Sequence, residues 1–231
     1  MQESQQLWLI PALPLIGAAI NGLLGPRLSK MIVSGVAVGS VVLSFLWVLK
    51  TLSALGSMDK THVEHLFTWF TSGTMNVGVD FAVDRLTAVM LLIVTGVGSL
   101  IHVYATGYMS HDEGYARFFA YLNLFMFFML VLILGANFLV MFVGWEGVGL
   151  CSYLLIGFYF KEKWAGDAGN KAFIVNRVGD FGFALAMFLI FIQFGSLDFA
   201  TVFAKIAPMP VEAAGGVLTT IALLLFVGAC G

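Results

Sequence analysis

The sequence is dominated by long apolar runs that short polar segments separate. A helix needs about twenty consecutive apolar residues to cross a bilayer, and seven segments meet this requirement. They are residues 7–25, 31–55, 84–108, 117–134, 137–160, 171–194 and 215 onward. These runs show none of the strict alternation typical of membrane β-barrels. The pattern therefore predicts an all-α polytopic membrane protein with about seven transmembrane helices.

Local sequence signals refine the helix plan. Only Gly135 and Ala136 lie between the fourth segment and the fifth, which begins at Asn137, so we expect these two helices to be antiparallel neighbours. Glycine suits a helix C-terminus and asparagine suits an N-cap. Asp84 is expected to cap the third helix in the same way. Proline removes a backbone donor, and Pro14 is therefore expected to bend the first helix, together with Pro11.

One stretch outside the helices has the pattern of β-structure. Within residues 66–83, the segment 77–83 alternates apolar and other residues, and it follows a Ser-Gly pair at positions 72–73. Alternation behind a turn signal is typical of a hairpin. We therefore expect a small extramembrane β-hairpin at 66–83.

Composition agrees with a membrane protein. The 231 residues are 60% hydrophobic and 10% charged, and the mean hydropathy is +0.98. Soluble domains are about a quarter charged. A formal net charge of −2 gives no reason to expect a nucleic-acid partner. Cys151 and Cys230 both lie in apolar runs outside any CxxC motif, so they are interpreted as packing residues, and no metal or cofactor is expected in this chain.

Charged residues inside the apolar runs are the candidate functional residues. Glu146 lies near the middle of the fifth segment, and Arg177 and Asp180 lie one helical turn apart in the sixth. A charge at the centre of a membrane helix costs about 2.5–3.5 kcal/mol, so these side chains should face protein or water. Two interpretations stay open: a structural Arg177–Asp180 ion pair, and a Glu146 carboxylate that takes up and releases protons.

Lys171 and His102 are weaker candidates. Lys171 lies at the edge of the sixth segment, where it either snorkels to the membrane surface or takes part in function. His102 is the histidine placed well inside an apolar run. A bis-histidine haem needs two such residues, so His102 is interpreted as hydrogen-bonded or proton-relaying.

Three motifs carry a resemblance to a known family. They are GWEGVGLCSYLLIGF at 144–158, KAFIVNRVGDFGF at 171–183 and GYARFFAYLNLF at 114–125, and VTGVGSLIHVYATGYM at 94–109 extends the match. Together they resemble the distal antiporter-like membrane subunit of respiratory complex I, the family of subunit L of bacterial NADH-quinone oxidoreductase. The resemblance covers essentially the whole chain.

The resemblance implies a domain plan and a role for the charged residues. Residues 1–113 would hold the first three helices and the hairpin, and residues 114–231 would begin the first antiporter-like repeat. The glutamate matching Glu146 pairs in that family with a lysine of the seventh helix, which would follow Gly231 directly. Arg177 and Asp180 match positions in the polar region beside it. The chain is therefore expected to be the N-terminal part of a longer protein.

The implied function is proton translocation driven by quinone reduction in partner subunits. NAD(H), FMN, iron–sulfur clusters and quinone would all be bound by those partners, and the neighbouring antiporter-like subunit and membrane lipid would contact this chain. The expected location is the bacterial inner (plasma) membrane, with the mitochondrial inner membrane as the alternative. An Mrp-type sodium/proton antiporter subunit and a purely structural membrane scaffold are the competing interpretations.

Overall fold

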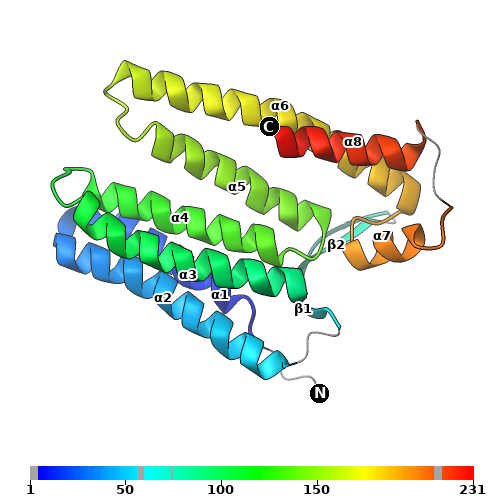
Figure 1. Ribbon diagram of the computed structural model, residues 1–231, viewed down its shortest axis with the longest axis horizontal. Helices are drawn as coiled ribbons and strands as arrows, with labels where there is room; N and C mark the ends of the chain where they lie inside the picture. Colours follow the sequence, from blue (N-terminus) through cyan, green and yellow to red (C-terminus); the bar gives the residue numbers. More distant parts are fainter. Residues whose placement is uncertain (1–4, 57–59, 74, 211–214) are drawn as a thin grey trace.

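The computed structural model describes residues 5–56, 60–73, 75–210 and 215–231, and it is mainly helical (Figure 1). The elements in chain order are α1 (Leu9–Leu23), the 3-10 helix η1 (Gly25–Arg27), α2 (Lys30–Leu55), β1 (His62–Ser72), β2 (Met75–Val83), α3 (Arg85–Tyr108), α4 (Tyr115–Leu134), α5 (Phe138–Ile156), α6 (Lys163–Phe194), α7 (Phe199–Ile206) and α8 (Val217–Cys230).

The long helices are arranged as a bundle with further helices added to one side. Helix α1 packs against α2 and α4, and α2 packs against α3, so that α1–α4 form the bundle. Helix α5 packs on α4, α6 packs on α5, and α8 packs on α6. In Figure 1 the chain accordingly runs from the bundle through α5 to the α6–α8 layer. Helix α5 is therefore the element that joins the two parts.

Every predicted membrane segment contains a helix, but several boundaries differ. Among the described residues, the five helices α2 to α6 are each long enough and apolar enough to cross a membrane, whereas α1 and α8 are shorter apolar helices. Helix α6 begins at Lys163, earlier than the predicted 171, and α5 ends at Ile156. The short helix α7 was not predicted, because it lies in a mixed segment with no long apolar run. Its N-cap is Asp198, which accepts from the Thr201 amide.

The predicted caps are confirmed. Asp84 accepts a hydrogen bond of 2.7 Å from the amide of Thr87, and Asn137 accepts one of 2.8 Å from the amide of Val140. Both side chains satisfy amides of the first helical turn, which have no acceptor within the helix. Asp84 thus fixes the start of α3, and Asn137 fixes the start of α5.

Helix α1 continues through Pro14 with help from α2. Because proline has no amide hydrogen, the carbonyl of Ile10 receives no helical hydrogen bond from position 14. The hydroxyl of Ser44 on α2 donates to this carbonyl at 2.7 Å. Pro11 lies in the first turn of α1, where an amide hydrogen would have no acceptor within the helix. The structure therefore accommodates both prolines without an unpaired carbonyl at Ile10.

The predicted hairpin is confirmed and is longer at its start. Strands β1 and β2 pair antiparallel from His62 opposite Val83 to Ser72 opposite Met75, with two irregularities in register. The hairpin is bonded to the linker between α4 and α5. The amide of Ala136 donates to the Asp80 carbonyl at 3.0 Å, and Asn137 Nδ2 donates to the Gly78 carbonyl at 2.9 Å.

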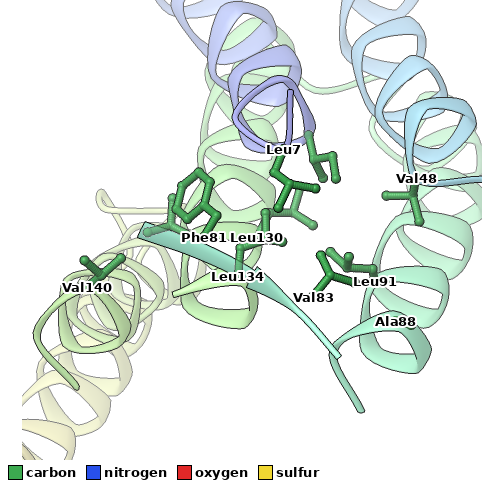
Figure 2. Packing of buried hydrophobic residues seen from close by; sticks show 11 residues of the cluster. Leu7, Val48, Phe81, Val83, Ala88, Leu91, Leu130, Leu134 and Val140 are labelled. Carbon is green, nitrogen blue, oxygen red and sulfur yellow. The ribbon is translucent and has the colours of Figure 1, made fainter. Parts of the chain in front are cut away.

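Apolar side chains of the hairpin close one end of the bundle. Figure 2 shows Phe81 and Val83 of β2 among leucines and valines of the surrounding helices. The cluster of buried residues comprises Leu7, Ile10, Val48, Phe81, Val83, Ala88, Leu91, Leu130, Val131, Leu134 and Val140. Each Å² of apolar surface that these side chains remove from water stabilises the fold by about 25 cal/mol. The hairpin therefore takes part in the core as well as in the linker contacts.

Glycines bring α4 and α5 together, and the pairing confirms that these helices are antiparallel neighbours. A Cβ atom at Gly144 would overlap the backbone of Leu132, and one at Gly147 would overlap the ring of Phe128. The contact residue on α4 moves from 132 back to 128 as the residue on α5 advances from 144 to 147, as expected for antiparallel helices. Small residues allow this close approach of membrane helices.

This contact predicts that Gly144→Ala destabilises the protein. The added methyl group would lie 2.6 Å from the Leu132 Cα, so the backbone of α4 would have to shift. We expect a loss of about 1–3 kcal/mol of stability, as is usual for overpacking, measured by thermal unfolding in detergent. The control is Gly39→Ala, because a methyl group at position 39 would meet no other part of the chain within 4 Å. Equal stability of the two variants would contradict the packing described.

Candidate functional site

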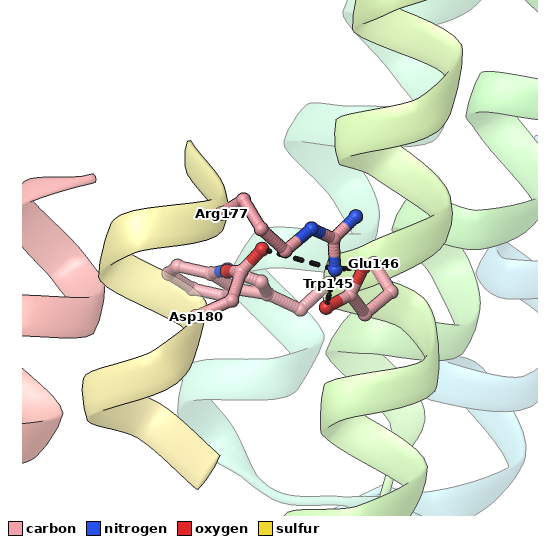
Figure 3. Close-up of polar contacts among 4 residues, drawn as sticks. All are labelled: Trp145, Glu146, Arg177 and Asp180. Carbon is pink, nitrogen blue, oxygen red and sulfur yellow. Dashed lines mark hydrogen bonds and ion pairs between the residues drawn. The ribbon is translucent and has the colours of Figure 1, made fainter. Parts of the chain in front are cut away.

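The candidate site lies between α5 and α6. Helix α5 carries Trp145 and Glu146, and α6 carries Arg177 and Asp180, whose side chains point toward one another in Figure 3. The separation of three positions between Arg177 and Asp180 places both on one face of α6. The four side chains therefore form a single polar cluster across the two helices, which we call the α5–α6 charge cluster.

Arg177 is shared by two carboxylates. Its Nη1 atom donates to both carboxylate oxygens of Glu146, and it lies 3.5 Å from Oδ2 of Asp180. The indole Nε1 of Trp145 donates to Oδ1 of Asp180 at 2.9 Å. One guanidinium thus holds two carboxylates, while the second oxygen of Asp180 has its own donor.

The cluster is graded from buried to exposed. The exposed fraction of the side chain is 7% for Asp180, 27% for Glu146 and 48% for Arg177. The guanidinium carbon also lies 4.8 Å from the ring centroid of Phe173, which is within the range of a cation–π interaction. Asp180 is therefore the fixed member, whereas Glu146 and Arg177 reach the surface of the chain.

Aromatic and glycine contacts hold the cluster in place. Phe183, one turn beyond Asp180, packs its ring 5.7 Å from that of Trp145 and 5.3 Å from that of Phe142. On the other side of α6, Gly179 lies against the end of α8, where a Cβ atom would be 2.8 Å from the Cα of Gly231. These contacts orient the indole donor and set the position of α6.

The structure brings together the main residues predicted from sequence. Glu146, Arg177 and Asp180 are in contact, and the expected Arg177–Asp180 ion pair is present, but Arg177 also binds Glu146. The cation that Glu146 lacks on its own helix is therefore supplied by α6. Trp145 was not predicted as a site residue, although an indole beside a buried acid is a candidate donor.

Lys171 and His102 lie apart from the cluster. Lys171 is exposed, and in the described part of the chain it makes no hydrogen bond or ion pair. The sequence prediction for Lys171 therefore stays a prediction. His102 is buried in α3, with 1% of its surface exposed, and its Nδ1 is 2.8 Å from the Gly98 carbonyl. Among the described residues, no group of three or more His, Cys, Asp or Glu is placed to hold a metal ion.

Two family descriptions match the sequence. Residues 69–119 match NADH-Ubiquinone oxidoreductase (complex I), chain 5 N-terminus, and residues 135–231 match NADH:quinone oxidoreductase/Mrp antiporter, TM. The second match contains the whole α5–α6 charge cluster.

Curated relatives carry consistent names. The chain is 42% identical over 226 residues to NADH-quinone oxidoreductase subunit L of Mycobacterium tuberculosis and 43% identical over 220 residues to that of Escherichia coli. It is 41% identical over 223 residues to NADH-ubiquinone oxidoreductase chain 5 of Metridium senile. These matches cover 95–96% of this chain and 35–36% of the relatives, so the chain spans about a third of their length.

Solved structures support the same fold. The Mrp complex from Dietzia aligns with a TM-score of 0.79 at 22% identity, covering 96% of this chain and 23% of that chain. The archaeal membrane-bound sulfane sulfur reductase aligns with a TM-score of 0.78 at 20% identity, covering 97% and 33%. The helices and the charge cluster define an integral membrane protein with the antiporter-like fold. Within that class, the chain belongs to the family of complex I subunit L and chain 5.

The shared guanidinium predicts strong coupling between Arg177 and Glu146. Arg177→Gln leaves two carboxylates without a cation, and Glu146→Gln leaves Arg177 with Asp180 alone, so each variant should lower stability. Removing one member of a buried ion pair costs about 3–5 kcal/mol of stability. Because Arg177 and Glu146 are partly exposed, we expect each single variant to lose about 3 kcal/mol or less. The double variant should lose less than the sum, because both charges of the pair are then absent. Thermal unfolding of the wild type, the two single variants and the double variant measures this coupling. If the stability losses of the single variants add up to that of the double variant, the coupling is contradicted.

Proposed function

We propose that this chain belongs to the proton-translocating membrane part of an NADH-quinone oxidoreductase. The carrying observation is the sharing of Arg177 between Glu146 and Asp180 inside two apolar helices. A purely structural pair needs one carboxylate, and the second adds a cost of about 2.5–3.5 kcal/mol on insertion scales. Retaining both favours a role in which the charge distribution changes during function.

The geometry suggests how the cluster would work. The guanidinium stays charged at any working pH, so a proton gained or lost in the cluster must be on a carboxylate. Asp180 is held by Trp145 and is nearly buried, whereas Glu146 is partly exposed and bonded to Arg177. We assign the exchanging proton to Glu146, because this carboxylate reaches the surface of the chain, and we assign Asp180, which accepts from the Trp145 indole, as the retained counter-charge.

A charge change nearby would drive this exchange. If a new negative charge draws Arg177 away, Glu146 loses its cation and takes up a proton; when Arg177 returns, the proton is released. This is a two-state element whose populations depend on its surroundings. In the proposed complex the bias comes from quinone reduction in partner subunits, and the proton moves along water and polar side chains. Lys171 is assigned a weaker, supporting role at the edge of α6.

The proposal places cofactors and partners outside this chain. NAD(H), FMN, iron–sulfur clusters and quinone would be bound by partner subunits, and this chain would carry no redox centre. Its contacts would be with other membrane subunits, especially the neighbouring antiporter-like subunit, and with lipid. The bacterial inner (plasma) membrane is the proposed location, supported by the bacterial relatives; the mitochondrial inner membrane is the alternative, supported by the chain 5 relative.

A sodium/proton antiporter of the Mrp type is the second candidate function. The observations that favour it are the family description that includes Mrp antiporters and the fold of the Dietzia Mrp complex. The names of the curated relatives favour the oxidoreductase. Ion exchange driven by a sodium gradient alone, with no electron donor present, would favour the antiporter.

The proposed role of Glu146 predicts that Glu146→Gln uncouples the complex. In the full-length subunit, the amide keeps the shape of the side chain but cannot release a proton, so NADH-driven proton uptake into inverted vesicles should fall well below wild type. The quinone-reduction rate is recorded in the same sample, together with the amount of assembled complex. The matched control is Glu162→Gln, because Glu162 lies before α6 and makes no side-chain cap.

Two results would contradict the proposal. The first is an assembled Glu146→Gln complex with unchanged proton uptake per NADH and unchanged turnover, which makes Glu146 a packing residue. The second is a Glu162→Gln complex with the same loss as Glu146→Gln, which removes the link between the loss and the charge cluster. Loss of assembly in Glu146→Gln with normal coupling in the remaining complex supports the structural scaffold.

A further inference from the structure

The α1–α4 bundle contains polar side chains that the charge cluster does not use. Asn21, His102 and Asn123 are buried, with at most 1% of their surface exposed. In the described part of the chain, four buried side-chain atoms lack a hydrogen-bond partner: Asn21 Oδ1, Trp47 Nε1, His102 Nε2 and Asn123 Oδ1. Leaving such atoms unpaired is costly, so each needs an explanation.

The hydrogen bonds of these residues show what the unpaired atoms require. Asn123 Nδ2 donates to the Ala37 carbonyl at 3.3 Å and to Ser40 Oγ at 2.6 Å, and Asn21 Nδ2 donates to the Val33 carbonyl at 3.2 Å. These contacts fix both amides, so their Oδ1 atoms are the free acceptors. A third acceptor comes from His102.

The histidine tautomer follows from its one contact. The Gly98 carbonyl can only accept, so His102 Nδ1 carries the hydrogen, and Nε2 of the neutral ring is an acceptor. Asn21, His102 and Asn123 thus present one free acceptor atom each. Asn123 Nδ2 uses both of its hydrogens, whereas Asn21 Nδ2 uses one and keeps the other free to donate. Trp47 differs, because its free atom is a donor and its ring packs against the separate cluster that contains Val48.

Contacts between the helices place the three acceptors at one level of the bundle. A Cβ atom on Gly17 of α1 would lie against both Ser40 and Asn123, and Asn21 is one turn further along α1. The Phe119 ring, one turn before Asn123 on α4, is 6.5 Å from the His102 ring. One helical turn advances about 5.4 Å. The residues that carry the three acceptors, on α1, α3 and α4, therefore lie within about a turn of one another along the bundle.

We infer that the α1–α4 bundle holds a buried water-binding site formed by His102 Nε2, Asn123 Oδ1 and Asn21 Oδ1. The ligand must supply three donors to these neutral acceptors inside an apolar bundle. One water supplies only two hydrogens, so the site takes at least two water molecules, and the fourth hydrogen joins one water to the other. Buried waters in proteins typically make about three hydrogen bonds to otherwise unpaired groups. Ser40 belongs to the same polar layer, because its Oγ accepts from Asn123 Nδ2 and donates to the Ala37 carbonyl. This site is separate from the charge cluster and does not depend on the proposed function.

Water-edited solid-state NMR of the full chain in lipid bilayers tests this site. With ¹⁵N-labelled His102 and Asn123, magnetisation should pass from water to both side chains at a rate comparable with that of His65, whose side chain is 58% exposed. The dry reference is the amide of Leu91, which is fully buried in the apolar cluster. Transfer to His102 and Asn123 as slow as to Leu91 would overturn the inference. So would a doubly protonated His102 ring, because Nε2 would then be a donor.

A variant tests whether the acceptors share one site. His102→Phe removes one acceptor and fills the space, so it should abolish most of the water transfer to Asn123. Thr95→Val is the control, because the Thr95 hydroxyl is buried but bonded to the Leu91 carbonyl at 2.6 Å; this variant should keep the transfer. Unchanged transfer to Asn123 in His102→Phe would overturn the shared site. If the variant does not fold, the wild-type transfer rates to His102 and Asn123 still show whether water is bound at the site.

Discussion

A single guanidinium between two carboxylates is the interaction on which the rest of this structure depends. Arg177 joins Glu146 of α5 to Asp180 of α6, in helices apolar enough to span a membrane. Unpaired, three such charges would cost about 8–10 kcal/mol by summing insertion values. That cost explains the close packing around the cluster. An indole donates to Asp180, the Phe183 ring packs against that indole, and glycines allow close contact of α5 with α4 and of α6 with α8.

A second constraint, the need to pair every backbone group, connects distant parts of the chain to the cluster. The carbonyl left free by Pro14 is bonded by Ser44, and the hairpin is bonded to the linker at 135–137. Asn137 both caps α5 and binds the hairpin, so it fixes the residue at which α5 begins. The position of Glu146, about two and a half turns further on by helix geometry, follows from that start. The extramembrane element and the charge cluster are thus parts of one arrangement.

The sequence predicted much of this arrangement, because apolar runs and caps are local signals. Seven helical segments, the hairpin, the caps at Asp84 and Asn137 and the contact of α4 with α5 all follow from residues close together in sequence. The start of α6 at Lys163 was not predicted, because the first two turns of this helix contain polar residues whose hydropathy is like that of a loop segment. Helix α7 was missed for a similar reason. The Arg177–Asp180 pair was predicted from spacing on one helix, but the Arg177–Glu146 pair was not, because it depends on how α5 and α6 are rotated against each other. The role of Trp145 depends on the same rotation.

The central claim is that Glu146 changes its protonation state when quinone is reduced, while Asp180 does not. Redox-triggered infrared difference spectroscopy on the assembled complex measures this directly, because a protonated carboxyl group has a carbonyl band that an ionised one lacks. We predict a carboxyl band that appears or disappears on addition of NADH, is absent in Glu146→Gln, and persists in Asp180→Asn if that complex assembles. A difference spectrum identical in wild type and Glu146→Gln would contradict the claim.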